Sequence, residues 1–433
     1  MSEFPMVSIG DLAASRKGAI KIGPFGSQLK KEEMVAAGVK VYGQENVILD
    51  DFEVGSRRIS PSKFELLKSC ELQAFDVVLT MMGTIGKCSV FPRNAERGIM
   101  DSHLLRIQPD PNLATSEFLA RTLMAETVVV PQISRLSHGS IMSGLSSKIV
   151  RRLEIPLPSL AEQARIVQIL DTVDAAIKAT DRVIAKLEQV KQGLLHDLLS
   201  GAVSSKRASR DSAASAEILH AVDDPEVRRG WTSCELAFVI DPQRPVVYGI
   251  LMPGYGFAGG VPVVKVKDIR EGRINEDHLL LTDPRIDNEY RRSRLREGDL
   301  LFSIRGSVGR TAFVPSSLEG ANITQDTARI AVTGANAKFV AYYLQMPQVV
   351  SFIEVHTLGQ AVRGMNLRDV RRIPLILPPR AEQDVIADIL ESRDAEVQAE
   401  RRRSAKLHEL RNGLTDDLLT GRVRVTVDGE DAT

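Results

Sequence analysis

The sequence lacks the features of a disulfide-stabilised or membrane-spanning protein. Its three cysteines, Cys70, Cys88 and Cys234, are widely spaced and form no CxxC pair, so neither a disulfide framework nor a cysteine zinc site is expected. No apolar run approaches 18 residues, and no transmembrane helix or signal peptide is predicted. A reducing cytoplasm is the expected location.

Motifs for catalysis are also missing. The seven histidines include no HxxxH pair for a metal. Residues 254–259 satisfy GxGxxG in letters, but Met252-Pro253 precedes them and an apolar strand is expected after them, whereas a dinucleotide site lies between a strand and a helix. Residues 83–87 lack the first glycine and the final Ser or Thr of a P-loop, and no Asn-Pro-Pro-aromatic run is present for amino-methylation. We therefore expect no catalytic residue, metal site or cofactor in this chain.

The chain also lacks an excess of charge of either sign. It has 433 residues, with 56 Lys and Arg against 56 Asp and Glu. This balance argues against a strongly basic protein that coats nucleic acid, although a cancelled total can include basic faces. Binding of nucleic acid by the chain alone is expected to be weak and salt-sensitive. The length predicts two domains or more.

One stretch of the sequence occurs twice. Residues 151–203 align without a gap to residues 371–423, always 220 positions apart, with 24 identities among 53 pairs. The period is far longer than the 20–50 residues of a solenoid repeat. The chain therefore contains two copies of a half-protein.

The repeated stretch predicts a long helix. Ser159 and Glu162 form a capping box at its start, and Gly201 stands where it ends, which gives a rod of roughly 60 Å. Its apolar residues recur at coiled-coil spacing: Ile166, Leu170, Val173, Ile177, Ile184, Leu187, Leu194 and Leu198. The second copy keeps the ends of this seam: Ile386, Leu390, Val397, Leu407, Leu414 and Leu418. Its middle carries Arg393, Glu400 and Ser404, so looser packing is expected there.

A mixed region of short strands and a few helices precedes each long helix. Residues 83–87 and 306–310 share a Gly-x-x-Gly turn at an offset of 223, which indicates that these regions are related modules with divergent side chains. Residues 117–130 are predicted to be helical. Residues 202–230 have the polar composition of a linker. The predicted organisation is a first module (1–150), a first long helix (151–201), a linker (202–230), a second module (231–370), a second long helix (371–425) and a tail (426–433).

We predict an α+β fold in which two mixed α/β domains are joined by two long helices that pair as an antiparallel coiled coil. Antiparallel pairing would place the modules at opposite ends of the rod, related by a pseudo-two-fold axis. Parallel pairing would lose this symmetry, because the linker would have to retrace the rod. The alternative is two independent amphipathic helices, each lying on its own module. Dimeric proteins that read duplex DNA also hold two recognition elements a fixed distance apart, which separates their half-sites.

The motifs resemble those of the specificity subunits of type I restriction–modification systems. The pattern Pro-x-x-Ala-Glu-Gln, a long helix and Leu-Leu-x-Gly occurs at 158–201 and 378–421. The segment 22–30 (IGPFGSQLK) is similar to the start of that family's target-recognition domains, as are the stretches 248–249 and 260–262. Residues 321–326 (ANITQD) resemble a motif that often follows the Gly-x-x-Gly turn. The resemblance covers nearly the whole chain.

The resemblance implies a non-catalytic reader of double-stranded DNA. Each domain would read one half of a split asymmetric sequence, and the helix pair would set the spacer. Two methyltransferase subunits would dock on the helices, and two restriction/translocase subunits would complete the complex. The assembled complex would be an adenine-specific DNA methyltransferase and ATP-dependent endonuclease. S-adenosylmethionine, ATP and Mg²⁺ would belong to those partners.

Candidate DNA-binding residues are those with side chains suited to phosphates or base edges near the turns. They are Lys30, Lys31, Gln44, Asn46, Thr84, Lys87, Ser102 and His103 in the first module, and Lys265, Lys267, Arg305, Ser307, Arg310, Gln325 and Asp326 in the second. Each could equally be an ordinary solvated side chain.

The first turns of the helices provide candidate docking residues for the methyltransferase subunits: Glu162, Gln163, Glu382 and Gln383. Their simpler role is capping, because a carboxylate at a helix N-terminus complements the helix dipole. A second function remains open, that of a coiled-coil adaptor whose two modules bind proteins rather than DNA.

Overall fold

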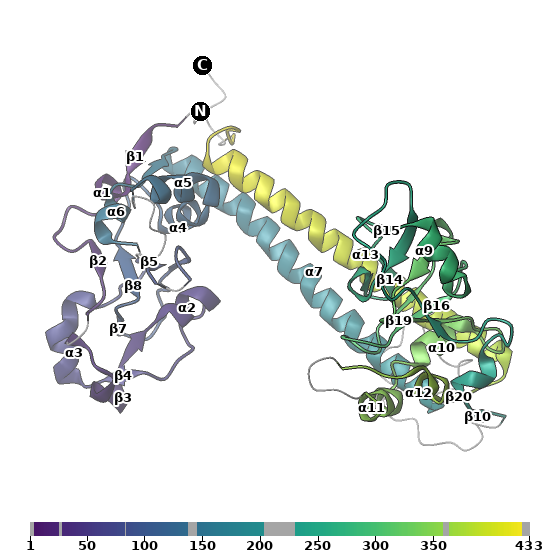
Figure 1. Ribbon diagram of the computed structural model, residues 1–433. Helices are drawn as coiled ribbons and strands as arrows, with labels where there is room; N and C mark the ends of the chain where they lie inside the picture. Colours follow the sequence, from purple (N-terminus) through teal and green to yellow (C-terminus); the bar gives the residue numbers. More distant parts are fainter. Residues whose placement is uncertain are drawn as a thin grey trace. The chain divides into compact units, whose positions relative to one another are not determined.

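The computed structural model describes residues 4–25, 28–82, 84–136, 145–202, 230–357 and 363–426 (Figure 1). The predicted linker and tail therefore lie almost entirely outside the described residues. The chain divides into two compact units: unit 1 contains residues 1–181 and 402–433, and unit 2 contains residues 182–401. Each unit holds one module together with parts of both long helices.

The first module is built on two sheets of short strands. The antiparallel sheet has the order β2 (Ile20–Ile22), β8 (Leu104–Ile107), β5 (Val77–Thr80) and β6 (Cys88–Val90). The other sheet has the order β4 (Arg58–Ile59), β3 (Met34–Tyr42) and β7 (Gly98–Met100), with β3 and β7 parallel. Every residue of β5 and β8 is buried, including the polar Thr80 and the charged Arg106, so these strands are covered on both faces.

The second module repeats this topology. Its antiparallel sheet has the order β11 (Val247–Tyr248), β19 (Thr327–Ile330), β16 (Leu300–Ser303) and β17 (Thr311–Phe313). Its mixed sheet has the order β15 (Leu280–Thr282), β12 (Val261–Val264) and β18 (Asn322–Ile323), with β12 and β18 parallel. The predicted repeat of two related α/β domains is therefore confirmed strand by strand.

A further strand pair joins each module to the segment before its long helix. β1 (Met6–Ser8) pairs with β9 (Glu154–Pro156), and β10 (Thr232–Glu235) pairs with β20 (Pro374–Leu377). The start of each repeated stretch thus belongs to a sheet of its module.

The helices of the modules are short. They are α1 (Ile9–Leu12), α2 (Gln44–Leu49), α3 (Pro61–Leu67), α4 (Ser116–Met124), α5 (Glu126–Leu136), α6 (Ser147–Arg151), α9 (Pro284–Glu289), α10 (Ala337–Tyr343), α11 (Pro347–Val355) and α12 (Leu367–Arg371). The prediction of one helix over 117–130 is wrong in one respect. Ala125 has an extended backbone, which separates α4 from α5.

The modules differ in the segment that follows two equivalent strands, β3 in the first module and β12 in the second. The first module has helix α2 there, whereas the second has a hairpin of β13 (Ile269–Arg270) and β14 (Arg273–Ile274). The shared sheets therefore carry different attachments in the two modules.

The two long helices are α7 (Leu160–Ser200) and α13 (Arg380–Leu419). The predicted capping box is confirmed: the Glu162 N–H donates to Ser159 Oγ at 3.3 Å, and the Ser159 N–H donates to Glu162 Oε2 at 3.0 Å. Gly201 and Gly421 follow the helix ends with φ of 72° and 73°, the left-handed conformation that glycine adopts without strain.

Each unit has a core to which both long helices contribute. In unit 1, Ile166 and Leu170 of α7 belong to the same buried cluster as Leu418 and Leu419 of α13. In unit 2, the buried cluster contains α7 residues Leu195, Leu198 and Leu199 and α13 residues Ile386, Ala387 and Leu390. Burial of one Leu or Ile side chain stabilises by about 1.5–3 kcal/mol, so these residues attach the helix ends to the modules.

Polar contacts accompany this packing. In unit 1, Arg411 Nε lies 2.9 Å from Asp174 Oδ1, and the Ser404 hydroxyl donates to Asp181 at 2.9 Å. In unit 2, Lys191 Nζ lies 2.5 Å from Asp394. The predicted polar middle of the second copy thus includes a buried residue, Ser404, that makes a specific contact. Within the described part of the chain, no helix combines the length and hydropathy needed to span a membrane.

Candidate DNA-reading surfaces

The Gly-x-x-Gly turn of the first module follows strand β5. The buried Thr80 hydroxyl accepts the Lys87 N–H at 3.0 Å and donates to the Thr84 carbonyl at 2.5 Å. Gly86 has a φ of 84°, which permits the tight turn. The turn thereby presents Thr84 and Lys87 as exposed side chains. Gly83 lies outside the described residues.

The second module builds the equivalent turn in the same way. Ser303 replaces Thr80, and its hydroxyl accepts the Arg310 N–H at 2.8 Å and donates to the Ser307 carbonyl at 2.5 Å. Gly309 has a φ of 94°. Ser307 and Arg310 are exposed at the positions of Thr84 and Lys87, so the turn presents a hydroxyl and a cation in both modules.

Three sequence-predicted residues of the second module come together beside this turn. Arg305 Nη1 donates to Gln325 Oε1 at 3.2 Å and lies 4.0 Å from Asp326 Oδ1. The Arg305 and Asp326 side chains are 50% and 43% exposed. Arg305 and Gln325 carry the donors and acceptors that read base edges in the major groove, and we name Arg305, Gln325 and Asp326 the reading cluster.

Arg310 differs from the reading cluster in its surroundings. Its Nη1 donates to the Ile269 carbonyl at 3.3 Å. It also lines a groove of about 1450 Å³, within unit 2, between the module and residues of α7 and α13.

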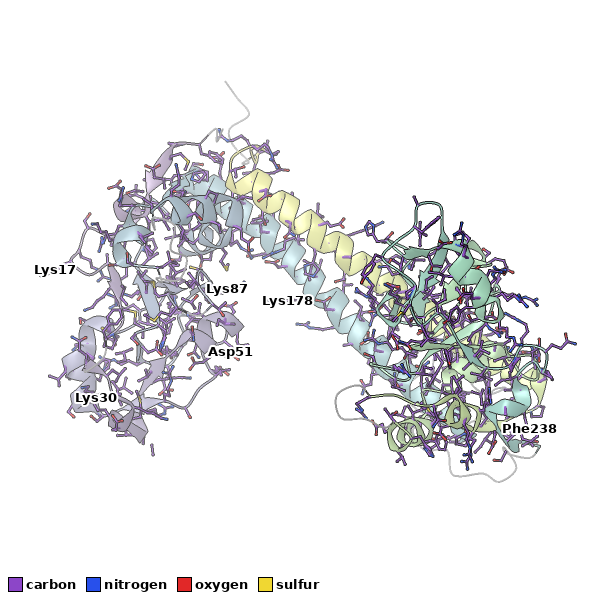
Figure 2. All side chains as sticks on the ribbon, in the orientation of Figure 1. Lys17, Lys30, Asp51, Lys87, Lys178 and Phe238 are labelled. Atoms are coloured by element: carbon purple, nitrogen blue, oxygen red, sulfur yellow. The ribbon has the colours of Figure 1, made fainter. Side chains whose placement is uncertain are left out.

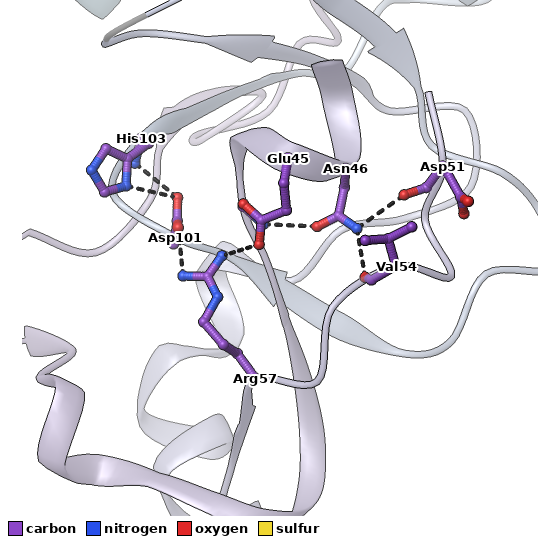
Figure 3. A network of polar contacts seen from close by, with 8 residues as sticks. Glu45, Asn46, Asp51, Val54, Arg57, Asp101 and His103 are labelled. Atoms are coloured by element: carbon purple, nitrogen blue, oxygen red, sulfur yellow. Dashed lines mark hydrogen bonds and ion pairs between the residues drawn. The ribbon is translucent and has the colours of Figure 1, made fainter. Parts of the chain in front are cut away.

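The first module has a charged network at the corresponding place (Figure 3). Arg57 donates to Glu45 at 2.8 Å and to Asp101 at 2.9 Å, and Asp101 accepts the His103 N–H at 2.9 Å. Burial alone would lower the pKa of Arg57, but the hydrogen bond and charge of Asp101, together with Glu45, raise that pKa above its usual value. Ser102 and His103 are both half-buried beside this network.

Sequence reasoning missed Arg57. Its partners Glu45 and Asp101 are 12 and 44 residues away in the chain, and no local pattern connects such positions. The network fixes the backbone that carries Ser102 and His103, so Arg57 supports those two candidates.

Asn46 does not fit the role of a DNA contact. It is 1% exposed, its amide oxygen accepts the Gly43 N–H at 3.0 Å, and its amide nitrogen donates to the carbonyls of Asp51 and Val54 (Figure 3). Because all of these groups are used inside the module, Asn46 holds the loop that follows α2.

The remaining first-module candidates do not form one group. Lys30 and Lys31 are exposed and Gln44 is half-buried. Figure 2 shows Lys30 well apart from Lys87 in the first module. In the second module, Lys265 and Lys267 line a hollow of about 430 Å³ beside Tyr255 and Phe257.

The family profile described as "Type I restriction modification DNA specificity domain" matches residues 1–189 and 257–409. The chain belongs to this family. Members of the family are the non-catalytic specificity subunits of type I systems, and the enzymatic activities of those systems reside in partner subunits. In the described residues, no group of three or more His, Cys, Asp or Glu side chains could hold a metal ion.

Individual specificity subunits are similar over large parts of the chain. The EcoBI specificity subunit of Escherichia coli is 28% identical over 246 residues, which cover 56% of this chain and 52% of that protein. The chain thus spans about half the length of this relative. The putative MjaX specificity subunit of Methanocaldococcus jannaschii is 24% identical, and the aligned residues make up 79% of this chain and 76% of that protein.

Solved structures have the same fold. One similar chain comes from a structure of complex assembly and conformational transition in the type I R-M system. Its TM-score is 0.56 at 18% identity, and the match covers 98% of this chain and 100% of that one. The type I system S subunit of M. genitalium has a TM-score of 0.54 at 13% identity, covering 98% and 97%.

The candidate docking glutamines of this specificity subunit are buried. Gln163 is fully buried, and it accepts the Thr115 N–H at 2.8 Å and donates to the carbonyls of Leu113 and Pro158. Gln383 accepts the Asn336 N–H at 2.8 Å. Neither amide is available to another protein in this conformation, so their predicted docking role does not agree with the structure.

The glutamates are engaged as well. Glu162 is 4% exposed and accepts two hydrogen bonds from Arg424 at 2.8 and 2.6 Å. Burial would raise its pKa, but Arg424 and the hydrogen bonds from Ser159 bring that pKa below its usual value. Glu382 accepts the Trp231 indole N–H at 3.3 Å. These contacts support capping and internal attachment.

Proposed function

We propose that this chain is the sequence-specific DNA-binding subunit of a cytoplasmic type I restriction–modification complex, in which each module reads one half of a bipartite asymmetric site. The observation that carries this proposal is the repetition of one strand order with unlike exposed side chains. Arg305, Gln325 and Asp326 of the second module stand where Met82, Ser102 and His103 stand in the first. Two such readers are suited to two different half-sites.

In the second module, the reading cluster and Ser307 are the assigned contacts. Arginine and glutamine can each make two hydrogen bonds to one base edge. In the first module, the assignment is Thr84, Ser102 and His103, with Lys30, Lys31 and Lys87 as phosphate contacts. Asn46 is omitted because it is buried.

The spacer is set by α7 and α13, which we propose to be one antiparallel coiled coil. The pairs Asp174–Arg411 and Asp181–Ser404 in unit 1 support this direction, because the residue number rises along α7 as it falls along α13. The pair Lys191–Asp394 in unit 2 continues the same register.

Methyltransferase subunits dock on the outer faces of these helices rather than on the buried glutamines. A hollow of about 550 Å³ in unit 1, lined by α4 and by Ala164, Val167, Gln168 and Asp171 of α7, supports this placement. S-adenosylmethionine, ATP and Mg²⁺ are assigned to the partner subunits. The adaptor alternative has no comparable support, because the matching family is one of DNA specificity domains.

The decisive experiment is to co-express the chain with its methyltransferase partner and to sequence methylated adenines in the genome. A single split asymmetric motif is expected. Methylation at a continuous palindrome, or none above the level of the methyltransferase alone, would refute the proposal. Arg305→Ala is expected to relax one half of the motif and to leave the other unchanged.

A further inference from the structure

An exposed apolar loop joins β11 to β12 in the second module. Tyr255 is fully exposed, Met252 is 83% exposed, and Leu251 and Phe257 are about half exposed at 49% and 46%. Folded domains seldom leave such a contiguous apolar group in water unless it contacts a partner. We name residues 251–257 the aromatic loop.

The aromatic loop is held firmly at its base. The Ile250 N–H donates to the Ile323 carbonyl at 2.7 Å, and the Gln325 N–H donates to the Ile250 carbonyl at 3.0 Å. The Thr282 hydroxyl donates to the Pro253 carbonyl at 2.9 Å. The loop therefore starts directly beside Gln325 of the reading cluster.

Glycines shape the tip of the loop. Gly254 and Gly256 have φ of 81° and 124°, and a Cβ on either would meet no atom within 4 Å. Their role is therefore the left-handed backbone, which residues with a side chain rarely adopt. A tip with this backbone projects the Tyr255 ring from a base that is fixed to the module.

The charge beside the loop is positive. The hollow next to Tyr255 and Phe257 is lined by Lys265, Lys267 and His278, and none of its lining residues is acidic. Among the described residues, neither lysine Nζ has a hydrogen-bond or ion-pair partner. Aromatic rings next to unpaired cations match the two parts of a nucleic acid, the base faces and the phosphates.

We propose that the aromatic loop is a wedge that enters the base stack of duplex DNA at or next to the half-site read by the second module. The Tyr255 ring, with Met252 beside it in the loop, contacts an unstacked base step, and Lys265 and Lys267 bind the adjoining phosphates. Apolar side chains of DNA-bending proteins unstack base steps in this way. This inference rests on the proposed DNA-reading function and adds a distortion of the DNA to it.

The first module has an exposed aromatic residue at the equivalent place. A Cβ on Gly23 would lie 1.9 Å from the Asp101 carbonyl, and one on Gly249 would lie 1.8 Å from the Ile323 carbonyl. In both modules, therefore, the strand that precedes the loop is followed by a glycine whose backbone lies against a neighbouring carbonyl. The exposed aromatic residue after Gly23 is Phe25, at 50% exposure. The strong distortion is therefore assigned to the second half-site.

The test uses the complex of the full chain with its methyltransferase subunits. The duplex contains the motif that the sequencing of methylated adenines identifies. 2-Aminopurine is placed in turn at each position of the second half-site and its flanks except the methylated adenine, which a methyltransferase itself flips out of the stack. Its fluorescence rises when a base loses its stacking. A rise at one step is expected with the unaltered chain. Tyr255→Ala should abolish the rise and weaken binding by about ten-fold, whereas Tyr255→Phe should retain both.

A matched control is Phe238→Ala, because Phe238 is another exposed aromatic residue of the same module, at 78% exposure, and lies outside the aromatic loop. It should change neither fluorescence nor affinity. An unchanged fluorescence rise and affinity in Tyr255→Ala would overturn the wedge. So would loss of methyltransferase co-elution in Tyr255→Ala, since the loop would then be a protein-docking element. Absence of any methylated motif with the unaltered chain would instead refute the proposed function itself.

Discussion

Gln163 and Gln383 make the same hydrogen bond in the two copies of the repeat. Each side-chain oxygen accepts, at 2.8 Å, the backbone N–H of the residue that caps a helix of its own module, Thr115 before α4 and Asn336 before α10. Each long helix is thereby connected to its module through one buried amide. The repeated Ala-Glu-Gln sequence is thus explained by the orientation of a module on its helix.

Replacement of Gln163 by leucine should destabilise unit 1. The Thr115 N–H and the Leu113 and Pro158 carbonyls would lose their partner, and each buried polar group left unpaired costs about 1–3 kcal/mol. Chemical denaturation followed by circular dichroism measures the change. Gln168→Leu is the control on the exposed face of α7 and should change stability by less than about 0.5 kcal/mol. Equal effects of the two variants would contradict this role.

Glu162 should make stability depend on pH below its ordinary pKa. Its pKa is lowered in the folded state, so its contribution is fully present above the unfolded pKa of about 4.3 and is lost as the pH falls through the lower folded pKa. Glu162→Gln should cost about 1–2 kcal/mol at pH 7. The difference from the unaltered chain should shrink towards pH 3, as measured by urea unfolding at both values. A constant difference would show that the Arg424 contact does not depend on the charge of Glu162.

Asn46→Ala should act on stability rather than on DNA contact. The loss of three hydrogen bonds, one buried and two partly buried, should destabilise the first module by about 1–3 kcal/mol, whereas Thr84→Ala, at an exposed turn, should leave the unfolding midpoint within error. Thermal unfolding of both variants checks this. A stable Asn46→Ala chain with altered methylation specificity would restore Asn46 as a DNA contact.

Lys87→Ala should weaken DNA binding uniformly. A lysine on a phosphate contributes affinity without sequence preference, so the slope of log affinity against log salt should fall by about one unit. The methylated motif should be unchanged. Arg305→Ala, in contrast, should alter the motif with a cost of about 1–3 kcal/mol at one base pair. Titration of labelled duplex at several salt concentrations separates the two cases.

Features of this fold that depend on local spacing were predictable from the sequence. The long helices, the Ser159–Glu162 capping box and the turns at Gly86 and Gly309 all arise from residues a few positions apart. The burial of Asn46 and the bridging position of Arg57 depend on partners brought together by the fold. The replacement of α2 by the hairpin of β13 and β14 also escaped prediction, because strongly diverged segments share no pattern to align.

The length of the helix pair should determine the spacer in the recognised DNA. Removal of residues 175–181 from α7 and 404–410 from α13 deletes two turns from each helix and keeps the proposed antiparallel register. The helix pair would shorten by about 10 Å, or about three base pairs at roughly 34 Å per turn of ten. Both half-sites should persist with a shorter gap in the methylated motif. Deletion of 175–181 alone is the control, because it breaks the register and should abolish methylation. An altered half-site with an unchanged gap would show that the helices do not measure the spacer.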